Sequence, residues 1–196
     1  MMTEIKLDNY TSIYKTNITY NKDELIKELY YNIDFNPQVM LDGAGREATI
    51  VITAKNIEYI KSICVDYIKK LKYPNNIVNY YQKNWVYTNN RHNTHTNWHS
   101  HEIIHKLPNV ENEWTYVFYV QMPNNLSGNE GKLSFKIGDS EYSILPDEGD
   151  IVIFPATLLH KPEMSPGSTQ DRIVIGGNFK EIDISKSISK KQKTLV

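Results

Sequence analysis

Three histidines are the residues of this chain whose type and spacing could support metal chemistry. His99 and His101 lie two positions apart, and His160 follows an apolar run that closes with Phe154-Pro155. If the segment around the first pair is a strand, both imidazoles point to the same face of it. Imidazole nitrogens suit iron, zinc, copper and nickel. Three protein ligands would leave coordination positions open, as a catalytic metal needs.

A solvated, histidine-rich loop is the simpler interpretation of the same residues. Five of the six histidines lie between residues 92 and 105, and a His-x-His pair alone is a weak signal. The frame formed by Gly149, Asp150 and Pro155 ahead of His160 favours a metal site instead. Arg172, twelve residues further on, strengthens that interpretation.

Arg172 could anchor an anion beside such a metal. Its guanidinium can hold a carboxylate through two hydrogen bonds. We expect the strand that it opens to lie beside the segment of His160. Tyr119 could add its hydroxyl to the same carboxylate. The alternatives are a surface ion pair for Arg172 and a plain core position for Tyr119.

Alternating short apolar runs must position these residues. Two amphipathic helices are predicted, at about 22–33 after the capping residue Asn21 and at about 54–71. One or two strands are predicted before residue 20. Further strand-like runs, separated by Gly, Pro and Asn turns, lie at 77–81, 85–87, 114–121, 132–136, 141–145, 151–154 and 172–179. Such close spacing predicts a mainly β sandwich or barrel rather than a parallel α/β sheet.

Length and composition fit one globular domain. The 196 residues are 40% hydrophobic and 23% charged. We expect a single domain over 1–184 with its β core at about 77–180. The Lys- and Ser-rich stretch 185–196 is predicted to be a flexible tail.

Charge and apolar patterning exclude several classes of partner. The formal net charge of −1 gives no sign of nucleic-acid binding. No apolar stretch approaches the ~20 residues of a membrane span. The N-terminal residues lack the apolar core of a secretory signal. The single cysteine, Cys64, excludes an internal disulfide, and its place in an apolar helical stripe predicts a buried, inert thiol. We therefore expect a cytoplasmic protein.

The span from about Asn84 to Phe179 resembles the double-stranded β-helix core of the Fe(II)/2-oxoglutarate-dependent dioxygenases. The closest likeness is to a group with a His-x-His pair. The matching motifs follow in order and approximate spacing: Trp85-Val86-Tyr87, His99-Ser100-His101, Val117-Phe118-Tyr119-Val120, Gly131-Lys132-Leu133, and Phe154-Pro155 with His160 and Arg172. The two predicted helices are consistent with the helices that buttress such a core.

The resemblance implies a chemistry and a set of roles. His99, His101 and His160 would hold Fe(II), and Arg172 with Tyr119 would bind the distal carboxylate of the co-substrate 2-oxoglutarate. Dioxygen would be the second co-substrate, and 2-oxoglutarate would be converted to succinate and carbon dioxide. The substrate that receives the hydroxyl group would be a protein side chain or a small molecule.

One position departs from the usual pattern of this family. Most members carry Asp or Glu where this chain has His101. Three arrangements remain open: a three-histidine site, which we favour; a site in which Glu102 joins one or both histidines of the pair; or a decayed site that binds iron poorly. On a regular strand, Glu102 would face away from the pair.

Two other functional classes compete with the oxygenase. Gly149, Asp150, Pro155 and His160 also fit the second motif of the cupins, which are metal-binding β-barrels of varied function. The first cupin motif, however, expects a glutamate where this chain has His105 and Lys106. The other alternative is a non-catalytic barrel that has kept an old fold.

Overall fold

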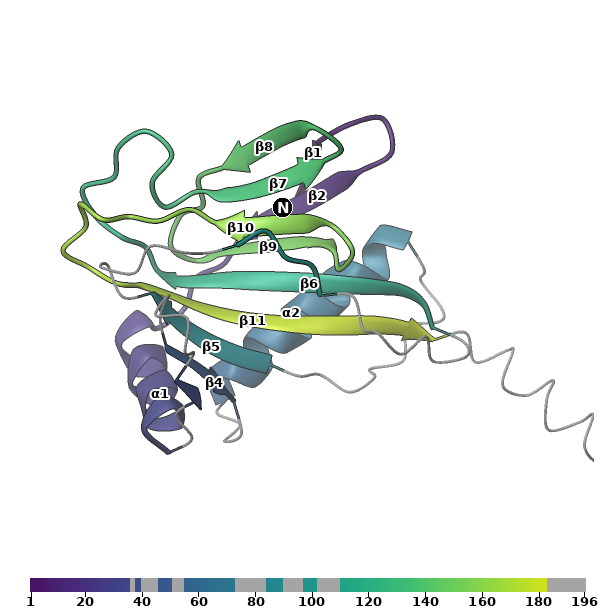
Figure 1. The fold of residues 1–196 in the computed structure, drawn as a ribbon. Helices are drawn as coiled ribbons and strands as arrows, with labels where there is room; N and C mark the ends of the chain where they lie inside the picture. Colours follow the sequence, from purple (N-terminus) through teal and green to yellow (C-terminus); the bar gives the residue numbers. More distant parts are fainter. Residues whose placement is uncertain are drawn as a thin grey trace, which may run out of the picture.

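Two antiparallel β-sheets, with two helices against one of them, make up the described part of the chain (Figure 1). The computed structural model describes residues 1–35, 38–39, 46–50, 55–72, 84–89, 97–101 and 110–182. The mainly β architecture with N-terminal helices is therefore confirmed.

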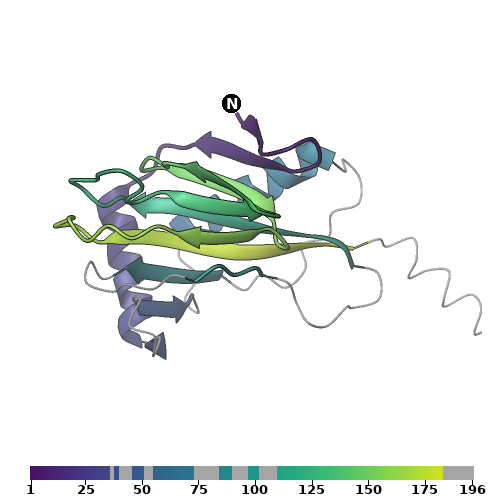
Figure 2. The ribbon, with the colours of Figure 1, turned by 45° about the horizontal axis from the view of Figure 1, so that its top comes forward.

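The larger sheet has eight strands and the smaller one has three. The order in the larger sheet is β1 (Thr3–Lys6), β2 (Ser12–Asn17), β9 (Asp150–Pro155), β6 (Val110–Gln121), β11 (Arg172–Ile182), β5 (Asn84–Asn89), β4 (Arg46–Thr49) and β3 (Gln38–Val39). The order in the smaller sheet is β10 (Leu159–Pro162), β7 (Leu133–Ile137) and β8 (Ser140–Ile144). The long strands β6 and β11 run side by side through the middle of the molecule (Figure 2).

The helices α1 (Lys22–Phe35) and α2 (Lys55–Lys72) cover one face of the larger sheet, which we call the outer face. Asn21 caps α1 as predicted, since its side-chain oxygen accepts a hydrogen bond of 3.3 Å from the backbone N–H of Glu24. Leu29 of α1 and Cys64 of α2 are fully buried in one cluster with Phe118 of β6. The predicted burial of the thiol is confirmed. No helix in the described ranges is long and apolar enough to cross a membrane.

The opposite face of the larger sheet, which we call the inner face, packs against the smaller sheet. Alternate residues of β6 point to the two faces, so Phe118 joins the helices while Tyr119 joins a second buried cluster. That second cluster contains Phe154 and Val174 of the larger sheet and Phe135 of β7. Side chains of the two sheets therefore pack against one another in the space between them.

Two adjacent glycines in β11 let aromatic rings cross the strand closely on both faces. A Cβ atom on Gly176 would lie 2.5 Å from the indole of Trp85. On Gly177 it would lie 2.4 Å from the ring of Tyr116. Trp85 belongs to β5 and Tyr116 to β6, and both pair with β11. The glycine pair therefore allows the indole to lie flat on the inner face and the phenol on the outer face.

One predicted neighbourhood is wrong. We expected the strand of Arg172 to lie beside the segment of His160, but β11 pairs with β6 and β5 in the larger sheet. His160 lies on β10, which pairs with β7 in the other sheet. The periodicity of the sequence did not mark β10 as a strand, because it has only four residues and ends in Pro162.

Several predictions fall outside the described residues. These are the strand-like run 77–81, most of the glycine-rich turn near residue 43, and everything after residue 182. The division into one domain over 1–184 and a tail over 185–196 therefore stays a prediction.

Candidate metal centre

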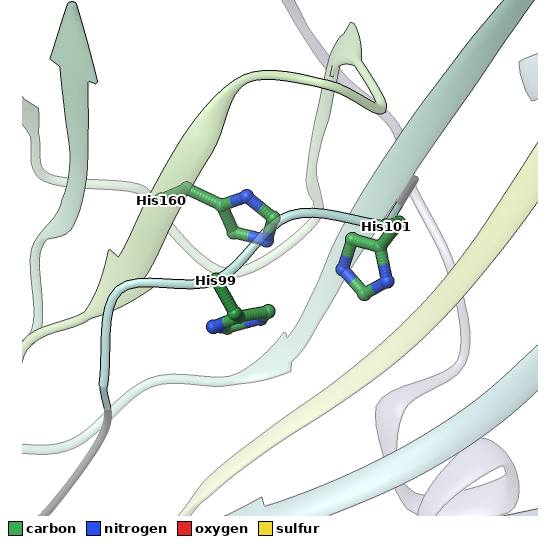
Figure 3. A group of neighbouring side chains, drawn as sticks. All are labelled: His99, His101 and His160. Carbon is green, nitrogen blue, oxygen red and sulfur yellow. The ribbon is translucent and has the colours of Figure 1, made fainter. Parts of the chain in front are cut away.

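The three histidines singled out in the sequence come together as neighbouring side chains (Figure 3). One ring nitrogen from each of His99, His101 and His160 lies within 4.8 Å of the other two. His160 is buried, His101 is half-buried and His99 is exposed. A cluster of this size, open on one side, is suited to a divalent metal ion with further coordination positions facing out.

Backbone hydrogen bonds fix the first two histidines against the third. The backbone N–H of His99 donates to the carbonyl of His160 at 3.0 Å, and the N–H of His160 donates back to the carbonyl of His99 at 2.9 Å. The N–H of His101 donates to the carbonyl of Ala156 at 2.8 Å. The segment 97–101 is thus tied down as an isolated antiparallel bridge and not as the regular strand that the His-x-His spacing suggested.

Two of the imidazoles are held in the tautomer that a metal ligand needs. Nδ1 of His99 lies 2.9 Å from the carbonyl oxygen of Asn97, and Nδ1 of His160 lies 2.9 Å from that of Leu158. Because a carbonyl oxygen can only accept, each Nδ1 must carry the hydrogen. The lone pair is then on Nε2, free to bind a metal, and the ring is oriented by the hydrogen bond behind it.

Burial keeps the inner imidazoles neutral. Desolvation, together with the proximity of His99, lowers the pKa of His101 to about 4 and that of His160 to about 3. A neutral imidazole is the ligating form. The aromatic ring of Phe154, 4.6 Å from the ring of His160 between centroids, supplies part of that apolar surrounding.

Arg172 lies on the inner face of the larger sheet with an unused donor. Its side chain is 2% exposed, and Nη1 donates to the carbonyl of Glu163 at 3.3 Å. Nη2 is buried and has no hydrogen-bond partner among the described residues. The Glu163 carboxylate is occupied elsewhere, by Ser134 Oγ at 2.6 Å and Lys161 Nζ at 3.3 Å. A surface ion pair, the alternative role considered for Arg172, is therefore wrong.

A buried guanidinium with a free N–H is suited to an anion. An unsatisfied buried donor calls for an explanation. Tyr119 is close enough to Arg172 to interact with it electrostatically; burial raises the pKa of its phenol, and Arg172 lowers it by less. Both residues belong to strands whose inner-face side chains surround the space between the sheets, and this arrangement fits a carboxylate-bearing ligand.

Glu102, the alternative carboxylate ligand, lies outside the described residues.

The role of Trp85 was missed by sequence analysis. Its indole stacks on the ring of His101, with centroids 5.1 Å apart and planes at 28°. No local pattern could have indicated this contact, because it depends on β5 pairing with Gly176 of β11.

No protein-family model matches the chain, and no curated protein matches its sequence. Solved structures do match. A prolyl-4-hydroxylase from Pseudomonas putida is 11% identical, with 87% of this chain and 93% of that chain covered and a TM-score of 0.63. The non-heme alpha-ketoglutarate-dependent carbocyclase SnoK from nogalamycin biosynthesis is 9% identical, with coverage of 86% and 79% and a TM-score of 0.68. A prolyl hydroxylase from Trichoplax adhaerens, in complex with a hypoxia inducible factor peptide fragment, is 16% identical, with coverage of 90% and 86% and a TM-score of 0.60.

The chain therefore has the double-stranded β-helix fold found in 2-oxoglutarate-dependent oxygenases, as the resemblance predicted. The shared feature is the fold, since identities of 9–16% carry no more than that. The reaction depends on the residues of the site and not on the fold alone.

Replacement of His101 by alanine should lower the affinity for Co(II) or Zn(II) by more than about 100-fold, because loss of even an outer hydrogen-bond partner of a ligand typically costs 10- to 100-fold. Glu102→Ala should change it far less. Competition with a chromophoric chelator measures both variants. A larger loss for Glu102→Ala would contradict the three-histidine arrangement.

Proposed function

We propose that the protein is an Fe(II)- and 2-oxoglutarate-dependent oxygenase that hydroxylates a protein side chain or a small molecule. The observation that carries this proposal is the combination of two features in one barrel. Three imidazoles converge on one point, and a buried arginine whose Nη2 has no hydrogen-bond partner among the described residues lies on the inner face of the larger sheet.

Each residue has a role that follows from its position. His99, His101 and His160 would hold the iron through ring nitrogens, two of which are already oriented by backbone carbonyls. Arg172 would donate its free Nη2–H to the distal carboxylate of 2-oxoglutarate, and Tyr119 would offer its hydroxyl. Iron and 2-oxoglutarate together supply the oxidising power by reductive activation of dioxygen, with decarboxylation to succinate.

The charge of the site favours a dianionic co-substrate. Three imidazoles leave a divalent metal with one more positive charge than the usual set of two histidines and one carboxylate. Arg172 adds a buried guanidinium within the same barrel. In surroundings of low polarity these charges attract an anion more strongly than they would in water. A dicarboxylate can neutralise the charge of the metal ion with one carboxylate and that of the Arg172 guanidinium with the other.

Apolar side chains limit the access of water to the two inner imidazoles. Phe154 covers one side of His160, and Trp85 covers His101. Exclusion of water protects reactive species from side reactions. Among the described residues, the exposed side of the cluster, next to His99, is where a substrate would approach.

The neighbours support two classes of substrate. Two of the three compared structures are prolyl hydroxylases, and one of these is bound to a peptide. The third is a carbocyclase from nogalamycin biosynthesis. We therefore propose a protein side chain or a small molecule as the substrate. The net charge of −1 gives no support to nucleic acid.

A cupin-type metal-binding role is less well supported than the oxygenase. Such a barrel has no particular need for a desolvated guanidinium whose Nη2 has no partner among the described residues, since an unsatisfied buried donor lowers stability unless a ligand completes it. The same argument applies to a non-catalytic barrel.

The direct test is anaerobic addition of Fe(II) and 2-oxoglutarate to the purified protein. We expect a visible charge-transfer band, and succinate should form once air is admitted. The variant His160→Ala should show neither, because it removes the most deeply buried ligand. If the native protein gives neither a band nor succinate, the oxygenase proposal is wrong.

Replacement of Arg172 by alanine should separate co-substrate binding from metal binding. We expect the Kd for 2-oxoglutarate to rise by about 30-fold or more, because loss of one partner of a buried charge pair costs at least about 2 kcal/mol. The affinity for the metal should stay within about threefold. Calorimetric titrations measure both constants. Equal losses of both would indicate misfolding and leave Arg172 without the assigned role.

A further inference from the structure

His101 differs from the other two histidines in what restrains its ring. His99 and His160 are each oriented by a backbone carbonyl that accepts from Nδ1. Among the described residues, no hydrogen bond reaches the ring of His101, and only its backbone N–H is tied, to Ala156. An imidazole without such a partner can rotate about its last side-chain bond, which would carry its nitrogens away from the cluster.

The indole of Trp85 supplies a restraint of another kind. It stacks on His101 at 5.1 Å between centroids and 28° between planes. The ring of His101 is in turn nearly parallel to that of His160, with centroids 5.0 Å apart and planes at 27°. The ring of His101 therefore has a nearly parallel contact with the indole and another with the innermost histidine, and rotation of its plane would break both contacts.

Trp85 is itself fixed by the strand beneath it. Gly176 is its partner across the β5–β11 pair, and a Cβ atom there would lie 2.5 to 2.6 Å from three atoms of the indole. The ring thus rests on bare backbone and cannot move toward it. Any side chain at position 176 would lift the indole from the inner face and press it into His101 or displace it.

We propose that Trp85 is the positioning residue for His101 and that its stacking holds the third imidazole in place as a metal ligand. Gly176 has no side chain, so the indole can pack directly on its backbone. This inference rests on the proposed metal centre. In a site where a histidine stands in the usual place of a carboxylate, the larger ring needs an orienting partner, and the indole takes the role that carbonyls take for His99 and His160.

Stacking is well matched to a metal-bound imidazole. Offset aromatic pairs contribute free energy beyond the area they bury, worth about two- to tenfold in an equilibrium constant. Coordination withdraws electrons from the imidazole and makes its ring more positive. The electron-rich face of an indole then attracts it more strongly, as in a cation–π contact. The contact should therefore favour the metal-bound state over the free one.

The test is anaerobic titration with Co(II), read by the visible ligand-field spectrum at saturation. Trp85→Leu removes the stacking surface, and we expect about tenfold weaker Co(II) binding with a changed spectrum. Trp85→Phe keeps an aromatic face and should stay within about threefold with the native spectrum. Gly176→Ala keeps the tryptophan, but the added methyl group displaces the indole, so this variant should reproduce the change seen for Trp85→Leu.

Tyr116→Phe is the matched control. Tyr116 lies against Gly177 on the outer face, and its hydroxyl donates to Asn84 Oδ1 at 2.6 Å. Loss of this buried hydrogen bond should lower the melting temperature but leave cobalt affinity and spectrum unchanged. If Tyr116→Phe alters the spectrum as much as Trp85→Leu does, Trp85 is merely structural and the proposal is overturned.

The outcomes also separate this inference from the proposed function. Absence of Co(II) binding by the native protein would overturn the metal centre, and the role of Trp85 with it. If the native protein binds Co(II) while Trp85→Leu and Gly176→Ala keep its affinity and spectrum, only the role of Trp85 is overturned. If Trp85→Leu does not fold, Gly176→Ala decides the question in the same way.

Discussion

The reciprocal pair of backbone hydrogen bonds between His99 and His160 is the constraint on which the candidate site depends. These bonds, of 3.0 and 2.9 Å, tie a short irregular segment to a four-residue strand of the smaller sheet. They set the distance between the two side chains without help from a metal. Because His101 is only two residues further along and is tied to Ala156, its ring reaches the same point. A ligand cluster formed in this way is preorganised, so little entropy is lost when a metal binds.

The two sheets contribute different parts of the site. The smaller sheet brings His160, whereas the larger sheet brings Arg172, Tyr119 and the indole of Trp85 on its inner face. The helices on the outer face make the larger sheet a fixed platform, with Cys64 and Phe118 in one buried cluster. The division explains how a site can be open at His99 and yet desolvated at His160 and Arg172. The electrostatic interactions of a metal ligand and of an anion-binding residue are stronger where water is excluded. A substrate must still be able to enter the site.

Sequence analysis predicted the parts that depend on local pattern. The capped helix after Asn21, the strand that carries Tyr119 and the mainly β fold all follow from periodicity and turn residues. The grouping of His99, His101 and His160 came from spacing and family resemblance together. What depends on strand pairing could not be predicted: Arg172 lies in the opposite sheet from His160 and not beside it. Trp85 reaches His101 only because it crosses Gly176, a contact that no run of residues encodes. The burial of the Arg172 side chain likewise depends on the packing of the two complete sheets.

We propose that one metal ion is held by three imidazoles, with a dicarboxylate between it and Arg172. A crystal structure of the protein grown anaerobically with Fe(II) and 2-oxoglutarate tests it most directly, with the iron located by anomalous scattering. We expect a single iron bound by ring nitrogens of His99, His101 and His160, and the distal carboxylate of 2-oxoglutarate on the guanidinium of Arg172. Iron bound by the Glu102 carboxylate with the ring of His101 turned away, or 2-oxoglutarate bound away from Arg172, would contradict it.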